Sequence, residues 1–131
     1  MSLSYPKPRD ILTKVVQLGV SDSSTEKCVL PKDAVVVEVV CNQTVAATTN
    51  PSTWLLGWSA DTDGLLNAFA SATTKVGQVH PGTTIGSGLF TPLTTDQKII
   101  STCTAGVSDT TSVVYVLIKY FVRGPGETAL S

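Results

Sequence analysis

Short runs of apolar and β-branched residues recur along this chain of 131 residues, and turn-forming residues separate them. Such runs predict β-strands when glycine, proline, aspartate or serine bounds them. The runs are residues 11–18, 27–30, 34–41, 53–58, 98–104 and 111–122. The glycine-rich stretch 76–90 predicts a long loop with two further short strands. About eight short strands in one domain predict an all-β fold, a jelly-roll-like β-sandwich.

Alternation within the strands predicts which faces are buried. The strand 34–41 has the densest β-branched run, and its core-facing positions are predicted to be Val35, Val37, Val39 and Cys41. Its other face carries Val36, Glu38 and Val40 and is only partly polar. We therefore expect that second face to contact another chain.

One short segment departs from the β pattern. Leu65, Leu66 and Phe69 have the spacing of one helix face. Asp61 or Asp63 just before them has the chemistry of a helix N-cap. The sequence therefore predicts one short helix in a connection between strands.

The two ends of the chain differ from its middle. Pro6 and Pro8 forbid a helix in residues 1–10 and favour an extended arm. The sandwich is expected over residues 11–123, followed by a short C-terminal tail at 124–131. An arm of this kind is either disordered or laid on another subunit.

Composition supports contacts between chains. Hydrophobic residues make up 42% of the sequence and charged residues 15%, against about 25% charged in a typical domain. Few charges are available to solvate a small monomer, so part of the surface is expected to lie against other chains. The alternative is a threonine-rich monomeric sandwich.

Charge and hydropathy exclude several partners. A net charge of −1 provides no field that attracts nucleic acid or an anionic membrane. No apolar run approaches the roughly 18 residues of a membrane span, and the N-terminus does not have the pattern of a signal peptide. We expect a soluble protein with no membrane or nucleic-acid partner, made in a reducing cytosol.

Residues that carry chemistry are sparse. Cys28, Cys41 and Cys103 are odd in number and scattered, which argues against disulfides and zinc and predicts three buried thiols. His80 is the single histidine and has no nucleophile motif beside it. The segment 61–64 resembles the start of a calcium loop but lacks the later glycine and glutamate. We therefore expect no catalytic residue, cofactor or metal.

Trp54 and Trp58 lie on one face of the same predicted strand, together with Leu56. Two tryptophans so placed fill a core, line a contact between subunits, or form a platform on which a sugar stacks. Core or oligomer contact is the favoured interpretation.

Three stretches carry a resemblance to a known family. Residues 30–40 (LPKDAVVVEVV) resemble the pattern LPxxAx(V/I)xxV. Residues 54–65 (WLLGWSADTDGL) resemble a second pattern, which begins with a hydrophobic residue and continues as x(V/I)Gx(S/T)ADxD(G/A). Residues 88–94 (GLFTPLT), with a later Ala-Gly pair, resemble the GxxTPLT and TAG motifs. With a matching final strand, the chain resembles over residues 28–122 the small jelly-roll decoration (cement) or head structural proteins of tailed bacteriophages.

The resemblance implies a structural protein, usually a trimer, without catalytic residues. The leading hypothesis is a capsid decoration protein on the outer surface of the virion, which stabilises capsomer contacts. Its expected partners are the major capsid protein and itself, as a homotrimer. The alternative is a head-fibre or tail-tip module that recognises host-surface carbohydrate. A cupin-type enzyme on the same fold would need several histidine ligands, and the single histidine of this chain cannot supply them.

The N-terminal arm is outside the family pattern, so its role rests on physical arguments. Prolines pre-extend it, basic residues can pair with acidic groups, and an aromatic residue offers an anchor. The residues expected to contact the capsid or a neighbouring subunit are Tyr5, Pro6, Lys7, Pro8 and Arg9.

Overall fold

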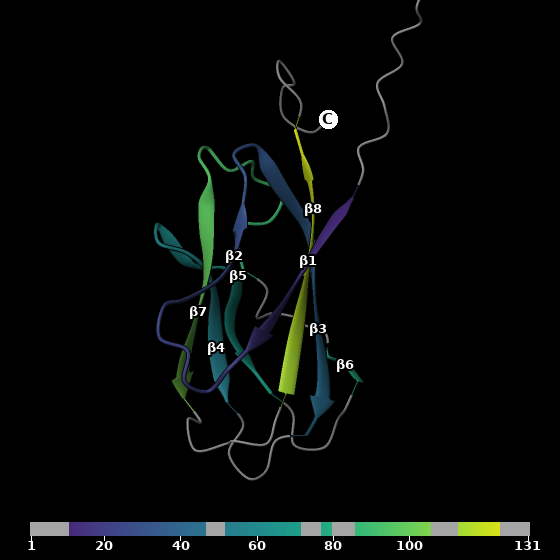
Figure 1. Cartoon of the computed structure of the whole chain (residues 1–131), viewed down its shortest axis with the longest axis vertical. Coiled ribbons are helices and arrows are strands. Elements are labelled where there is room, and N and C mark those ends of the chain that lie inside the picture. The colour runs from purple at the N-terminus through teal and green to yellow at the C-terminus, as the bar shows by residue number, and fades with distance from the viewer. Residues whose placement is uncertain (1–10, 47–51, 72–76, 80–85, 106–112, 124–131) are drawn as a thin grey trace, which may run out of the picture.

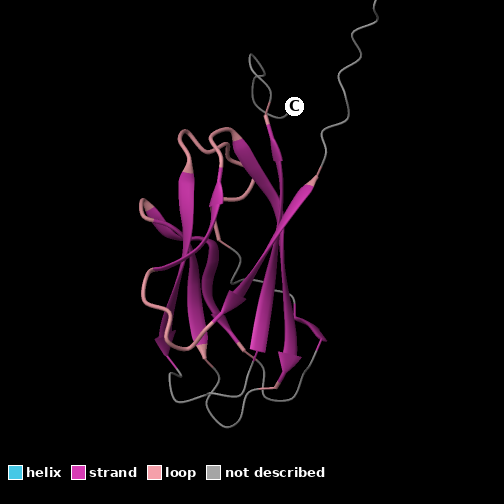
Figure 2. Cartoon of the chain, in the orientation of Figure 1, coloured by secondary structure: helices cyan, strands magenta, loops and turns pink. Residues whose placement is uncertain are grey.

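The computed structural model describes residues 11–46, 52–71, 77–79, 86–105 and 113–123. Within these ranges the chain forms strands and no helix (Figure 2). The eight strands of the described residues are β1 (Leu12–Leu18), β2 (Thr25–Leu30), β3 (Ala34–Val45), β4 (Thr53–Trp58), β5 (Asp61–Ala70), β6 (Gly77–Val79), β7 (Gln97–Ala105) and β8 (Val113–Val122). No helix in this part of the chain could cross a membrane.

The strands form two four-stranded sheets that pack face to face (Figure 1). Sheet A has the order β1-β8-β3-β6, and sheet B has the order β2-β7-β4-β5. The first strand thus lies beside the eighth, the second beside the seventh, the third beside the sixth and the fourth beside the fifth. All these pairs are antiparallel. This is the order that results when one long hairpin is wound into two sheets, and it confirms the predicted jelly roll.

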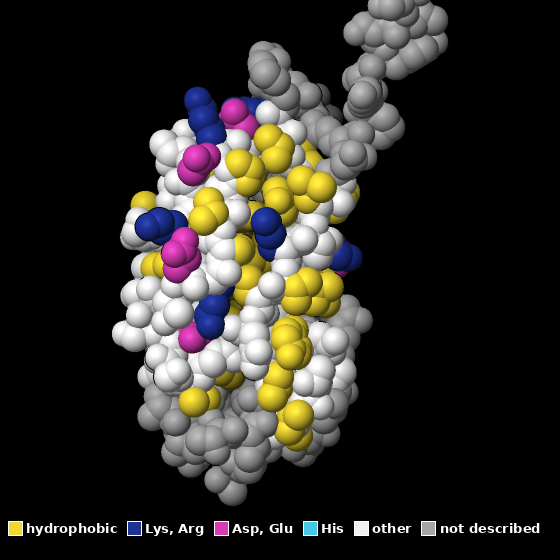
Figure 3. All heavy atoms as spheres, viewed as in Figure 1, with side chains coloured by type: hydrophobic (Ala, Val, Ile, Leu, Met, Phe, Trp, Pro, Cys, Tyr) yellow, Lys and Arg dark blue, Asp and Glu magenta, His cyan; other side chains and the backbone are white. Residues whose placement is uncertain are grey.

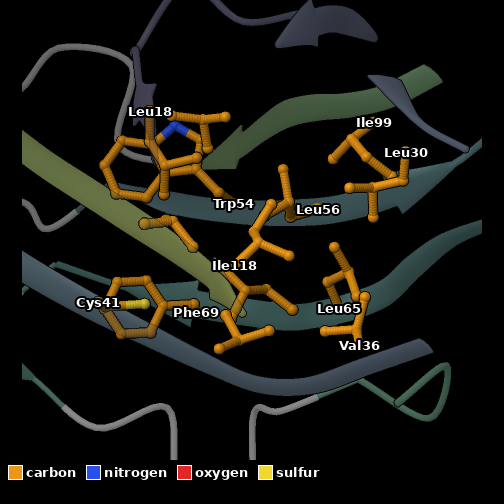
Figure 4. Packing of buried hydrophobic residues seen from close by; sticks show 14 of the residues in the cluster. Leu18, Leu30, Val36, Cys41, Trp54, Leu56, Leu65, Phe69, Ile99 and Ile118 are labelled. Carbon is orange, nitrogen blue, oxygen red and sulfur yellow. The ribbon is translucent and has the colours of Figure 1, made fainter. Parts of the chain in front are cut away.

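The core lies between the two sheets (Figure 4), and most of the buried side chains among the described residues are apolar. Sheet B contributes Trp54, Leu56 and Ile99, which point toward residues of sheet A such as Ile118 and Cys41. Burying side chains of this size stabilises the fold by about 1.5–3 kcal/mol each. The sandwich therefore provides a rigid body on which surface features are fixed.

The predicted faces of β3 are correct for only half of the strand. Val36 pairs with Tyr120, whereas Glu38 pairs with Lys119, so Val37 is an extra residue that forms a β-bulge. The bulge reverses the alternation. Before it, Ala34 and Val36 face the core, and after it Val39 and Cys41 do. Val36 was predicted on the mixed face and is in the core, because alternation cannot be extended through a bulge.

The predicted helix at Leu65–Phe69 is wrong, since these residues belong to β5. Leu56 pairs with Leu66 and Trp54 with Phe69. An advance of two residues along β4 is therefore matched by three residues along β5, so β5 has one extra residue here. Ala68 in the extra step has a φ of 59°. The bulge brings residues three apart onto the buried face, which imitates helical spacing. Neither Asp61 nor Asp63 is an N-cap, because both lie in β5.

Candidate interaction surfaces

A connecting segment, residues 86–93, joins the two sheets on the side where β5 forms the edge of sheet B. The backbone N–H of Gly86 donates to the carbonyl oxygen of Leu65 at 2.8 Å, and that of Gly88 donates to Gly64 at 2.7 Å. These bonds fix the first half of the segment to β5.

The second half of the same segment is fixed to sheet A. The N–H of Phe90 donates to the carbonyl of Val36 at 2.8 Å, and that of Leu93 donates to Ala34 at 3.0 Å. The N–H of Asp33 in turn donates to the carbonyl of Leu93 at 2.8 Å. The segment thus covers the part of β3 that lies beyond its pairing with the short strand β6. The three stretches that carry the family resemblance therefore meet at one place.

Trp58, at the end of β4, packs in this place against glycine backbone. A Cβ atom on Gly64 would lie 2.8 Å from Cη2 of the Trp58 ring, and one on Gly88 would lie 2.8 Å from the carbonyl oxygen of Gly64. Both separations are too short for real atoms. Only glycine at these positions allows the indole and the two backbones to approach so closely.

A cleft of about 220 Å³ opens beside Trp58. We call it the Trp58 cleft, and its lining residues are Trp58, Asp61, Ser87, Gly88, Thr91, Pro92, Leu93, Thr94 and Gln97. Loss of hydration raises the pKa of the Asp61 carboxyl above its ordinary value, and a hydrogen bond and negative charge from Asp63 raise it further. The cleft thus combines one aromatic ring with a carboxyl group, hydroxyls and an amide.

A second candidate surface is the outer face of sheet A, formed by β1, β8 and β3. The strand register places Val15, Leu117 and Val40 in one row across the three strands. Val15 is 59% exposed. Hydrophobic side chains form a band over β1 and β8 in Figure 3, whereas most of the visible charged side chains lie over β2 and β7. This face is therefore suited to protein contact.

Polar rows flank that apolar row. On one side the register aligns Thr13, Lys119 and Glu38, with Lys119 Nζ 3.5 Å from Glu38 Oε2. A groove of about 310 Å³ runs between this ion pair and the apolar row. Because both charged groups are largely solvated, the pair adds little to stability and serves better to orient a contact.

The two tryptophans have different environments. Trp54 is 1% exposed, and its Nε1–H donates to the carbonyl oxygen of Gly19 at 2.9 Å. Trp58 is only partly buried and lines the cleft. A platform of two exposed rings is therefore absent from β4, and one accessible indole remains.

The other residues singled out in the sequence lie elsewhere. Tyr5, Pro6, Lys7, Pro8 and Arg9 are outside the described residues, as is His80. Cys41 is buried, and loss of hydration raises the pKa of its thiol to about 12. Cys28 and Cys103 are only half-buried, so the prediction of three buried thiols holds for one. Among the described residues no three acidic, cysteine or histidine side chains gather as a metal site would require.

This chain resembles a known protein in its fold and not in its sequence. No family model and no curated protein matches this sequence. The fold, however, occurs in a phage capsid. A chain of the solved "Cyanophage Pam1 capsid asymmetric unit" matches with a TM-score of 0.65 and 14% sequence identity, over 94% of this chain and 92% of that chain. The two chains therefore share one fold over nearly the whole of both, which agrees with the fold that the family resemblance implied.

Sequence reasoning missed the connecting segment and the Trp58 cleft as structural features. The signal that was available is the set of four glycines at positions 57, 64, 86 and 88, each of which has no room for a side chain. Close backbone approach is a recognised reason for glycine in a strand or loop. Their partners, however, lie far apart in the sequence and could be found only in the folded chain.

Proposed function

We propose that this protein is a bacteriophage capsid decoration protein, which binds the outer surface of the head and stabilises contacts between capsomers. The observation that carries the proposal is the shared fold with a chain of a phage capsid asymmetric unit, over nearly the whole of both chains. The sequence motifs of residues 30–40, 54–65 and 88–94 support it independently, because they point to the same class of protein.

The outer face of sheet A is the proposed contact surface. Its row of Val15, Leu117 and Val40 crosses three strands, and the Glu38–Lys119 pair beside it can set the orientation of a partner. Apolar contact supplies affinity, and charged groups at the rim supply specificity. The partners are the major capsid protein and further copies of this chain.

We propose a homotrimer as the working form. Three linked copies engage the shell together, so contacts that are weak singly combine into tight binding. We further propose that Tyr5 to Arg9 of the N-terminal arm contact a neighbouring subunit. Ten extended residues reach at most about 35 Å, which is enough to cross onto an adjacent chain.

Binding to phage heads that lack this protein tests the proposal. Purified protein should co-sediment with such heads to a fixed stoichiometry, and the decorated heads should retain DNA to a higher temperature. Binding of the protein without thermal stabilisation would contradict the stabilising role, and absence of binding would contradict the proposal as a whole.

Two variants locate the contacts in the same assay. Deleting residues 2–9 should leave the unfolding temperature nearly unchanged, since the core cluster is formed by residues of the sandwich, but should weaken binding to heads. Val15→Asp should weaken binding through sheet A, whereas Val29→Asp, at an exposed position on β2 of sheet B, is the matched control. If the deleted chain binds as tightly as the full chain, the arm has no role in docking.

A further inference from the structure

The Trp58 cleft has the mixture of groups that a sugar ring requires. A pyranose presents an apolar face of C–H groups and a rim of hydroxyls. The cleft offers the Trp58 indole for the first, and the Asp61 carboxyl and the Gln97 amide for the second. We propose that the Trp58 cleft binds one neutral pyranose unit of a glycan, with the indole against the ring face and Asp61 and Gln97 bonded to its hydroxyls.

The polar groups that line the cleft are available to a ligand. Gln97 uses its Nε2 atom to bond Thr95 Oγ1 at 3.0 Å, which orients the amide and leaves its carbonyl oxygen as an acceptor. The Asp61 carboxyl lies near that of Asp63, which helps to raise its pKa, and a carboxyl group has several acceptor positions that a sugar hydroxyl can use. Hydrogen bonds from sugar hydroxyls to a carboxylate are stronger than those between neutral groups.

The cleft is formed before any ligand arrives. The Gly88 to Gly64 hydrogen bond of 2.7 Å holds the connecting segment on β5, and both glycines abut the Trp58 ring. A site fixed by backbone bonds loses little conformational freedom on binding. Its volume of about 220 Å³ lies below the roughly 300–1,000 Å³ of pockets for drug-sized ligands, so it suits a single ring and not an oligosaccharide.

The groove on sheet A does not have this chemistry. It is lined by Glu38, Val40, Asn42, Leu117 and Lys119, with no aromatic ring among them, and its two charged groups pair with each other. A metal ion is also a poor occupant of the Trp58 cleft, because Asp61 and Asp63 are only two carboxylates and no larger ligand cluster lies among the described residues. A neutral sugar therefore fits the lining better than a cation does.

The inference is tested by titrating the full chain with methyl glucoside, methyl galactoside, methyl mannoside and N-acetylglucosamine. Binding is monitored by two-dimensional proton–nitrogen NMR. At least one of these probes should shift the indole N–H of Trp58 and the amides of Asp61, Gly88 and Thr91 in a saturable way. The affinity expected for one ring is weak, in the millimolar range. The inference is independent of the capsid proposal, since the isolated chain is used and no phage head is present.

Variants separate a true site from surface association. Asp61→Asn keeps the shape and should weaken binding about tenfold, the effect of losing a hydrogen bond to a charged group. Trp58→Leu should abolish binding of the sugar. If the Trp58→Leu chain does not fold, Asp61→Asn alone tests the site. Glu38→Gln, in the other groove, is the matched control and should bind like the wild type. The inference is overturned if no probe gives saturable shifts at the cleft, or if Asp61→Asn binds unchanged.

Discussion

The outer face of sheet A and the Trp58 cleft are built in opposite ways. On the first, β1 and β8 pair over seven consecutive positions without a shift of register, and exposed side chains define the surface. At the second, the pairing of β4 with β5 shifts register between Leu56 and Trp58, Phe90 adopts a positive φ, and backbone packs against an aromatic ring. A regular sheet thus yields a broad adhesive face, whereas irregular backbone yields a shaped cleft.

Trp54 and Trp58 give the largest test of this comparison. Trp54→Ala should lower the free energy of unfolding by about 3–5 kcal/mol, because it leaves a cavity in the core and strips the Gly19 carbonyl of its donor. Trp58→Ala should cost clearly less, since that ring is partly exposed. Urea unfolding of both variants measures the difference, and equal losses would show that Trp58 is a core residue after all.

Gly88 gives a test of intermediate size. Gly88→Ala should destabilise the fold by about 1–3 kcal/mol, because the new methyl group meets the Trp58 ring and the Gly64 carbonyl. Ser87→Ala is the matched control on the exposed neighbouring position and should change stability by less than about 0.5 kcal/mol. Thermal unfolding compares the two. A neutral Gly88→Ala would mean that the connecting segment yields and that the cleft is not rigid.

These two regions also separate what the sequence predicts from what it does not. Strand positions and the jelly roll follow from short β-branched runs and turns, and Thr53–Trp58 matches its predicted range. The face of β3 and the helix at Leu65–Phe69 were predicted wrongly for one reason. A single inserted residue in each strand changes the phase of alternation, and bulges have no local signature strong enough to reveal them.

The cleft illustrates a different limit. It depends on contacts such as Gly86 with Leu65 and Leu93 with Ala34, which join residues distant in the sequence. Glycine content marks the segment as a loop but does not say what it packs against. Trp58 on one face of β4 could be predicted, whereas its environment could not.

A third and smaller test concerns the association of subunits and leaves the folding of each chain unchanged. Purified wild-type protein should scatter light as a trimer at tens of micromolar, and Val15→Asp should shift it toward monomer, because a charge then interrupts the exposed apolar row. Val29→Asp, at an exposed position on β2 of sheet B, should not do so. Both variants should unfold within about 0.5 kcal/mol of the wild type. A wild-type chain that is monomeric in solution would contradict this arrangement, as would a trimer unaffected by Val15→Asp.

The smallest expected effect is electrostatic and belongs to the cleft. The pKa of Asp61 is raised in the folded chain, so this group favours folding when protonated, and that contribution is lost as the pH rises through its folded pKa. Asp63→Asn removes the neighbouring charge and should lower the pKa of Asp61 toward its ordinary value. Carbon NMR titration of the Asp61 carboxyl measures it, with Thr62→Ala as the control. An Asp61 pKa that Asp63→Asn leaves unchanged would show that the two carboxyl groups do not interact.

The most direct test of the capsid role is a cryo-electron microscopy map of the whole phage particle at a resolution that resolves strands. We predict this sandwich on the outer surface of the head, in groups of three that bridge neighbouring capsomers, with the face formed by β1, β8 and β3 turned toward protein. Finding the chain inside the shell, in the tail, or absent from the particle would contradict it.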